Sequence, residues 1–281
     1  MRILILSDIH ANLEGLEACL EAAPQHDRVF NLGDVVGYGA NPNEVTERAR
    51  ALGEVFVRGN HDKACSGIMS LEGFNPVAAQ AVMWTRERLT PHNLEFLRGL
   101  PQGPVAPLEN LQCVHGSPRD EDEYVLLRRE AYSILAHPAA PLIFFGHTHV
   151  QGAYWIDDHT ESEGTVAPAY ASAKNKEQCT LALSPARKYL INPGSIGQPR
   201  DGPQAFNGFS YSPPACPRGW AETNSSSLLG ANLSSSVPWI RSWSPRLTRL
   251  LWSSDMRLRP WRRSLRESRL LWWRTPTIAK V

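Results

Sequence analysis

Five short apolar segments in the first 150 residues are each followed directly by a polar cluster that contains histidine, aspartate or asparagine. The segments span 2–7, 28–32, 54–58, 111–114 and 142–145. Their length and their content of leucine, isoleucine, valine and phenylalanine predict buried strands, and helical patterns lie between several of them. Alternation of this kind is typical of βα units around a buried sheet, so the sequence predicts an α/β fold.

Helix signals support this interpretation. Asn12 can cap a helix over 13–23, whose apolar residues fall on one face. Three further helices are predicted where asparagine or threonine precedes proline, at 41–42, 75–76 and 90–91. The proline-spaced segment 101–107 predicts a loop, and later strands, partly antiparallel, are predicted at 152–156, 179–184 and 188–191.

The polar clusters matter because each stands at the end of a predicted strand. They read Asp8-Ile9-His10, Gly33-Asp34, Gly59-Asn60-His61-Asp62, His115-Gly116 and Gly146-His147-Thr148-His149. In open α/β sheets the ligand crevice lies beyond the carboxyl ends of the strands. We therefore expect the five clusters to meet at one edge if the strands run parallel and adjacent.

These clusters offer imidazole, carboxylate and amide oxygen donors and no thiolate. That donor set suits borderline divalent metals such as Mn, Fe, Ni, Co or Zn. The donors are too many for one tetrahedral ion and about right for two ions that share a carboxylate. The sequence therefore predicts a centre with two divalent metal ions.

The order of the motifs is that of a known family. Asp8-x-His10, Gly33-Asp34-x-x-Gly37, Gly59-Asn60-His61-Asp62, His115 and Gly146-His147-x-His149 follow one another as in the calcineurin-like metallophosphoesterases, which the chain resembles. Within that family it is most similar to the small bacterial phosphodiesterase branch. The resemblance continues through Asn192-Pro193-Gly194-Ser195 to Arg200 and so covers about residues 1–203. It implies a four-layer α/β/β/α sandwich of two mixed β-sheets flanked by helices.

The resemblance also implies how the two ions are held. It assigns Asp8, His10 and His149 to one ion, assigns Asn60, His115 and His147 to the other, and makes Asp34 the bridge between them. Mn²⁺ is the expected metal, with Fe, Ni, Co and Zn as alternatives.

Phosphodiester hydrolysis is the activity that this centre predicts. Two ions lower the pKa of bound water toward about 7, so that hydroxide can attack phosphorus at neutral pH. His61 directly follows a ligand without being one, and is the candidate general acid for the leaving group. Asp62 is expected to orient its imidazole through the other ring nitrogen. Tyr38, Arg119 and Arg200 lie on loops after motif strands and are the candidate substrate contacts.

Several alternatives stay open. The protein Ser/Thr phosphatase branch carries Asp-Arg-Gly where this chain has Gly37-Tyr38-Gly39, and Glu where it has Asp62. These differences weigh against a protein phosphatase and against a symmetrical dinucleoside tetraphosphatase of that type. A nuclease acting on single-stranded nucleic acid and a non-catalytic scaffold that retains the fold are the rival hypotheses. The expected substrate is a small phosphodiester or nucleotide-type molecule. Nucleic acid is expected only as an alternative substrate and not as a binding partner.

Residues 204–281 differ in composition from the part before them. Residues 1–203 hold 17 basic and 25 acidic side chains, whereas 204–281 hold 12 basic and 3 acidic ones. The second segment also contains seven of the nine tryptophans and 14 serines. We interpret it as out-of-frame translation of GC-rich DNA, without a core of its own, that leaves the sheet without its closing strand. The alternative is a basic amphipathic appendage over 261–274.

Other features bound the class of protein. The five cysteines are odd in number, widely spaced and without a CxxC pair, which excludes a disulfide scaffold or a zinc ribbon as the organising element. No apolar run approaches the roughly 18–20 residues of a membrane span. Because the chain begins on a strand pattern without signal-peptide anatomy, a cytoplasmic protein is expected.

Overall fold

The computed structural model of the chain describes residues 2–168, 177–200, 247–253 and 269–275. Twelve strands within these ranges form two six-stranded sheets. The first sheet has the order β3 (Val55–Phe56), β2 (Arg28–Asn31), β1 (Arg2–Leu6), β11 (Leu247–Ser253), β12 (Arg269–Thr275), β9 (Glu177–Ala182). The second has the order β4 (Val105–Leu108), β5 (Leu111–Cys113), β6 (Leu142–Phe144), β10 (Arg187–Asn192), β7 (Gly152–Asp157), β8 (Ser162–Val166).

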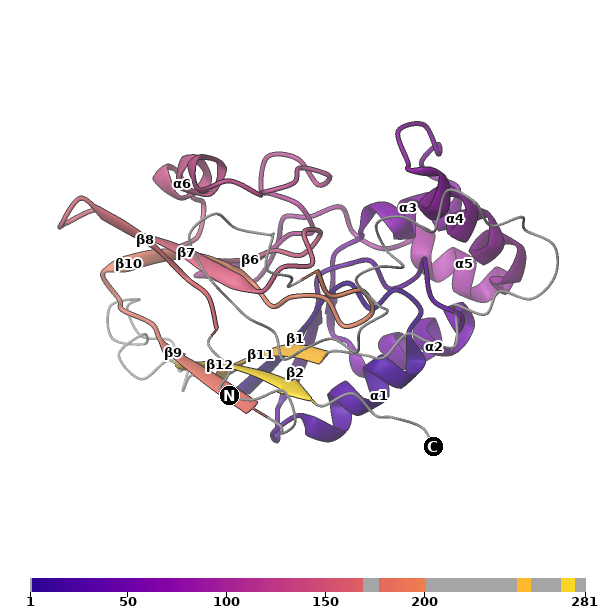
Figure 1. The fold of residues 1–281 in the computed structure, drawn as a ribbon, viewed down its shortest axis with the longest axis horizontal. Helices are drawn as coiled ribbons and strands as arrows, with labels where there is room; N and C mark the ends of the chain where they lie inside the picture. The colour runs from indigo at the N-terminus through magenta and orange to yellow at the C-terminus, as the bar shows by residue number, and fades with distance from the viewer. Residues whose placement is uncertain (1, 169–176, 201–246, 254–268, 276–281) are drawn as a thin grey trace, which may run out of the picture.

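Helices cover the outer faces of both sheets. They are α1 (Leu13–Ala22), α2 (Pro42–Leu52), α3 (Asn60–Ser66), α4 (Pro76–Arg88), α5 (Pro91–Arg98) and α6 (Arg128–Ala136). Figure 1 shows α1 and α2 to the right and lower right of the first sheet and α6 above the second, with α3, α4 and α5 grouped at one end. α1 packs against β11 and β12, and α6 packs against β7 and β10. The predicted four-layer sandwich is confirmed.

The alternation of side chains along the strands builds the three apolar layers. Ile3 and Ile5 of β1 point into the layer between the two sheets, whereas Leu4 and Leu6 point toward the helices on the other face. In the second sheet, Leu142 and Phe144 of β6 face the layer between the sheets, where Phe30, Leu111 and Tyr189 also lie. Because both faces of these strands are covered, they read in the sequence as continuous apolar runs.

The strands that precede the polar clusters run parallel to one another within each sheet. β1 pairs parallel with β2, and β2 with β3, in the first sheet. β5 pairs parallel with β6 in the second. Their carboxyl ends therefore lie at one end of each sheet, as the positions of the clusters predicted.

The prolines of the segment 101–107 predicted a loop, but part of this segment is a strand. β4 covers Val105–Leu108 and pairs antiparallel with β5. A proline is tolerated there because β4 is an edge strand of the second sheet, where a missing backbone N–H removes no ladder hydrogen bond from a central strand.

Two segments after residue 204 differ from the expectation of a sheet without its closing strand. β11 pairs antiparallel with β1, and β12 lies between β11 and β9. The free side of β1 offers unpaired N–H and C=O groups, which an apolar strand can satisfy through its backbone whatever its side-chain sequence. Within the segment 261–274 that the alternative makes an amphipathic appendage, the structure has the strand β12 from residue 269 onward. The out-of-frame origin stays a prediction about the coding DNA, and the other residues after 200 lie outside the described ranges.

In the part of the chain that the structure describes, no helix combines the length and the apolar character needed to cross a bilayer.

Candidate metal centre

The polar clusters converge where the parallel strands end, and their side chains form two groups of buried ligand atoms. One group contains Asp8, His10, Asp34 and His149, and the other contains Asp34, His115 and His147. Within each group the ligand atoms lie within 4.8 Å of one another. Asp34 belongs to both groups. We call Asp8, His10 and His149 the first half-site, and Asn60, His115 and His147 the second half-site.

The backbone is strained at these residues. Five of the candidate ligands have a positive φ, namely Asp8 (52°), His10 (50°), Asp34 (53°), His147 (63°) and His149 (61°). L-residues rarely adopt this left-handed conformation, and such strain concentrates at functional sites. None of these five residues is a glycine, so their residue types did not indicate this conformation.

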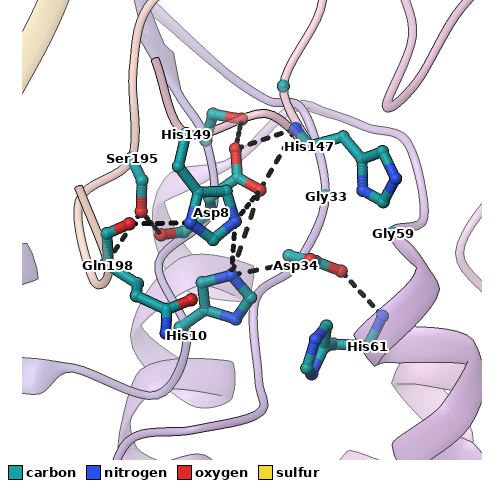
Figure 2. Close-up of polar contacts among 12 residues, drawn as sticks. Asp8, His10, Gly33, Asp34, Gly59, His61, His147, His149, Ser195 and Gln198 are labelled. Atoms are coloured by element: carbon teal, nitrogen blue, oxygen red, sulfur yellow. Dashed lines mark hydrogen bonds and ion pairs between the residues drawn. The ribbon is translucent and has the colours of Figure 1, made fainter. Parts of the chain in front are cut away.

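The first half-site holds two imidazoles with their nitrogen lone pairs facing each other. His10 Nε2 and His149 Nε2 lie 3.1 Å apart, and His149 Nε2 lies 3.2 Å from Asp8 Oδ1. Each ring has its Nδ1 on a backbone carbonyl, at 3.1 Å from Val36 O for His10 and 2.7 Å from Gln198 O for His149. Because a carbonyl only accepts, each Nδ1 carries the ring's proton and each Nε2 is left free to bind a metal. Figure 2 shows the His149 ring between Gln198 and Asp8.

In the second half-site a backbone carbonyl again fixes each histidine, but the two rings use different nitrogens. His115 donates from Nδ1 to Leu32 O at 2.8 Å, and its Nε2 lies 3.3 Å from Asn60 Oδ1. His147 instead donates from Nε2 to Asp122 O at 3.1 Å, which leaves Nδ1 for a metal. The three side chains therefore present two imidazole nitrogens and one amide oxygen.

Asp34 stands between the two half-sites. Its Oδ2 lies 3.6 Å from His10 Nε2 and 3.5 Å from His115 Nε2, and its Oδ1 accepts a 2.8 Å hydrogen bond from the backbone N–H of His61. A Cβ at Gly59 would collide with that oxygen, so only glycine fits beside it.

The electrostatics of the centre fit bound cations. Burial raises the pKa of Asp34 well above its ordinary value, and the nearby carboxylates of Asp62 and Asp8 add to this effect. Burial and then His149 lower the pKa of His10, while burial and then His115 lower the pKa of His147 to about 2. Burial alone would lower the pKa of His115, but the carboxylates of Asp34 and Asp8 raise it above its ordinary value. Positive charge next to a buried carboxylate keeps it ionised, and divalent ions can supply that charge.

His61 lies beside the centre without joining either half-site. Its ring centroid is 5.0 Å from that of His10 and 4.5 Å from that of Tyr38. Its Nδ1 is buried without a hydrogen-bond partner among the described residues, and Gly37 (φ +91°) leaves the space that the ring occupies. Burial, followed by the charges on His149 and other neighbours, lowers the pKa of His61 to about 3, so the ring is neutral at neutral pH.

Asp62 was expected to orient the His61 ring, but its carboxylate bonds to backbone amides instead. Its Oδ1 accepts from the backbone N–H groups of Val35 and Val36, at 2.9 and 3.2 Å, and its Oδ2 accepts from that of Gly59 at 3.0 Å. These bonds fasten the loop that carries Asp34 to the start of α3. Burial raises the pKa of Asp62 to about 6, although the amide donors favour its charged form.

The three candidate substrate contacts separate into two groups. Tyr38 packs against His10 and His61. Burial raises the pKa of both Tyr38 and Tyr124, and the nearby charge of Arg200 partly opposes this shift. Arg119 instead donates to Ser133 Oγ and Glu123 Oε1, both at 3.0 Å, on the side of α6. The structure therefore brings Tyr38 and Arg200 to the centre and leaves Arg119 in a surface ion pair.

Other residues at the centre escaped the sequence reasoning. Ser195 Oγ donates to Asp8 O at 2.8 Å and accepts from Gln198 N at 2.8 Å, and Ser7 Oγ donates to Asp8 Oδ2 at 2.5 Å. Tyr124 lies against His147, with ring centroids 3.7 Å apart. Only Ser195 and Gln198 lay within a motif, since both fall in the Asn192–Arg200 stretch.

Comparison with known proteins identifies the class to which this fold and this centre belong. A family model described as calcineurin-like phosphoesterase matches residues 1–158. The chain belongs to the calcineurin-like phosphoesterase family, and the predicted family is confirmed. Membership makes it a protein of the hydrolase class that acts on phosphoesters, and the buried Asp and His groups fit divalent metals.

Two known proteins are similar to this chain over most of its length. The chain is 36% identical over 204 residues to "Uncharacterized protein MJ0912" from Methanocaldococcus jannaschii, a match that covers 71% of this chain and 78% of that protein. A crystal structure of a metallophosphoesterase from Sphaerobacter thermophilus is 32% identical with a TM-score of 0.65, and the match covers 99% of this chain and 89% of that one. The narrower bacterial phosphodiesterase branch stays a prediction.

Proposed function

We propose that this chain hydrolyses phosphodiester bonds with two divalent metal ions, Mn²⁺ being the expected metal. The observation that supports the proposal most directly is Asp34, a single buried carboxylate within 3.6 Å of a histidine from each half-site. Each half-site would hold one ion, and Asp34 would contribute to both. Bound ions of this kind lower the pKa of water and compensate charge on phosphoryl oxygens.

His61 is the proposed general acid for the leaving group. Its ring lies next to the centre and its Nδ1 has no other partner in the described part of the chain. A neutral ring must first gain a proton. An anionic phosphodiester placed between the ring and the ions favours the protonated form, since an opposite charge within a few ångströms raises the pKa of an imidazole. Asp62 takes part as a positioning residue that holds Asp34 and α3 together.

The proposed substrate is a small phosphodiester or a nucleotide-type molecule. Arg200 is anchored by a 3.1 Å bond from its backbone N–H to His149 O, and its guanidinium donates to Gln198 Oε1 at 3.1 Å. It makes no ion pair with a carboxylate among residues that the structure describes, so its charge is available to phosphate oxygens. Tyr38 would line the other side, next to His61.

The test is an activity panel on metal-free and metal-loaded protein. We expect hydrolysis of bis-nitrophenyl phosphate and of small nucleotide diesters with Mn²⁺, loss of turnover with a chelator, and recovery on adding Mn²⁺ back. Single-stranded DNA in the same panel distinguishes the nuclease alternative. Folded, metal-loaded protein that cleaves no phosphate ester would contradict the proposal and favour the scaffold alternative.

A further inference from the structure

A network of four charged side chains joins helix α3 to the loop that follows β5. Lys63, on α3, is only 5% exposed. Its Nζ lies 2.7 and 2.5 Å from the two carboxylate oxygens of Asp122 and 3.0 Å from Glu121 Oε1. Arg58, just before α3, donates to both oxygens of Glu121 at 2.8 and 2.9 Å. We call these four residues, Arg58, Lys63, Glu121 and Asp122, the clamp.

The loop on the other side of the clamp is braced internally. The N–H of Gly116 donates to Glu121 O at 3.0 Å, and that of Ser117 donates to Asp120 O at 2.9 Å. A Cβ on Gly116 would come within 2.7 Å of Glu121 O, so the loop closes tightly on itself. The pair between Lys63 and Asp122 therefore ties this braced loop, with the Asp122 backbone carbonyl, to α3.

That carbonyl orients a candidate metal ligand. Asp122 O accepts from His147 Nε2 at 3.1 Å and so leaves Nδ1 facing the second half-site. Tyr124, two residues further along, stacks on the same ring at a centroid distance of 3.7 Å. The loop thus fixes both the tautomer and the plane of His147.

The other ligands of the second half-site lie on the two elements that the clamp joins. Asn60 is the first residue of α3, three residues before Lys63, and His115 directly precedes the braced loop. The histidines of the first half-site bond to Val36 O and Gln198 O instead. Helix α3 reaches this half-site through the Asp62 carboxylate, which accepts from Val36 N–H, and not through an ion pair of the clamp.

We propose that Lys63 is a positioning residue for the second half-site, and that through the clamp it sets the affinity of that half-site for a divalent ion without affecting the first. The inference rests on the two-ion centre of the proposed function and not on any substrate. Removing a group that orients a ligand typically lowers metal affinity by about 10- to 100-fold.

The experiment measures Mn²⁺ binding by calorimetric titration of metal-free protein in two backgrounds. His10→Ala disables the first half-site and Asn60→Ala disables the second. We expect Lys63→Met to lower Mn²⁺ affinity about 10- to 100-fold in the His10→Ala background and to leave it unchanged in the Asn60→Ala background. Lys63→Arg, which keeps the charge, should recover most of the lost affinity.

Lys188→Met is the matched control. Its Nζ lies 2.6 Å from Asp158 Oδ2 in a pair remote from both half-sites, so its loss should change neither affinity. If Lys63→Met does not fold, Asp122→Asn keeps the backbone carbonyl while removing the partner charge, and should show the same selective loss.

The possible results separate the two proposals. Equal losses in both backgrounds, or no loss in either, would overturn the role of Lys63. One Mn²⁺ per wild-type chain would instead contradict the two-ion centre itself. Because the titration uses no substrate, the Mn²⁺ affinities can be interpreted even if the protein has no phosphodiesterase activity.

Discussion

The two half-sites share a bridging carboxylate but are supported by different kinds of interaction. In the first half-site, neutral groups fix the ligands, namely the carbonyls of Val36 and Gln198 and the hydroxyls of Ser7 and Ser195. In the second, the Leu32 carbonyl fixes His115, and the ion pairs of the clamp support the carbonyl that orients His147. Neutral hydrogen bonds keep their strength across pH and salt, whereas ion pairs weaken with acid and with salt. Affinity for the second ion should therefore respond more strongly to solution conditions.

The largest effect is expected where the two half-sites meet. Asp34→Asn removes the only carboxylate that both ligand groups share while keeping the size of the side chain. We expect both ions to bind weakly and turnover to fall to the buffer background, measured by metal analysis and by hydrolysis of bis-nitrophenyl phosphate. Asp158→Asn is the control, because this exposed carboxylate pairs with Lys188 and belongs to neither half-site. Full metal content in Asp34→Asn would remove its bridging role.

The next largest effect is expected outside both half-sites. His61→Ala should leave metal content nearly intact and lower kcat by about 10²- to 10⁴-fold for esters with poor leaving groups. The loss should be smaller for nitrophenyl esters, because nitrophenolate leaves without protonation. Comparison of kcat for the two ester types is the measurement, with His26→Ala as control, since His26 bonds to Pro24 O away from the centre. An equal loss for both types would rule out the general acid role.

A smaller effect is expected from removing the Ser195 hydroxyl, which supports the ligands of the first half-site. Ser195→Ala removes the hydroxyl that joins Asp8 O to Gln198 N, and Gln198 O orients His149. We expect about a 10-fold loss of Mn²⁺ affinity in the Asn60→Ala background and none in the His10→Ala background. This pattern is the reverse of that for Lys63→Met. A loss in both backgrounds would show that the two half-sites are not supported independently.

The smallest effect concerns the pH dependence of the clamp in metal-free protein. Burial alone would raise the pKa of Glu121, but hydrogen bonds and charges from Arg58 and Lys63 lower it below its ordinary value of 4.5. A carboxylate with a lowered folded-state pKa stabilises the protein above its unfolded pKa, and this contribution disappears as pH falls through the folded value. Glu121→Gln should therefore destabilise the protein by about 1 kcal/mol or less at pH 7. The difference from wild type should shrink below about pH 4.5.

Denaturant unfolding at several pH values measures this difference. Glu17→Gln is the control, because its pair with Arg48 is 2.7 Å long but exposed on both sides. A difference that stays constant from neutral to acid pH would mean that Glu121 contributes through packing and not through its charge.

Several features of the centre could be predicted from the sequence because they depend on local patterns. An apolar strand followed by Asp8-x-His10 or by His147-x-His149 can be recognised in the sequence. Parallel strands then bring their carboxyl ends to one edge of the sheet. The functions of Asp62 and Arg119 were harder to predict. Asp62 adjoins His61 in sequence, yet its carboxylate bonds to amides on another loop, and Arg119 turns toward Glu123.

The sequence by itself determined the donor set, its order and the layered fold, since residue type and periodicity fix the chemistry and the strand faces. Only the tertiary structure decided which nitrogen of each histidine is free for a metal, because the carbonyls that take the other proton come from residues as distant as Gln198 from His149 or Leu32 from His115. The same holds for the clamp. Lys63 and Asp122 are 59 residues apart, and nothing in either local sequence indicates that their charges meet; they do so because the two sheets pack face to face.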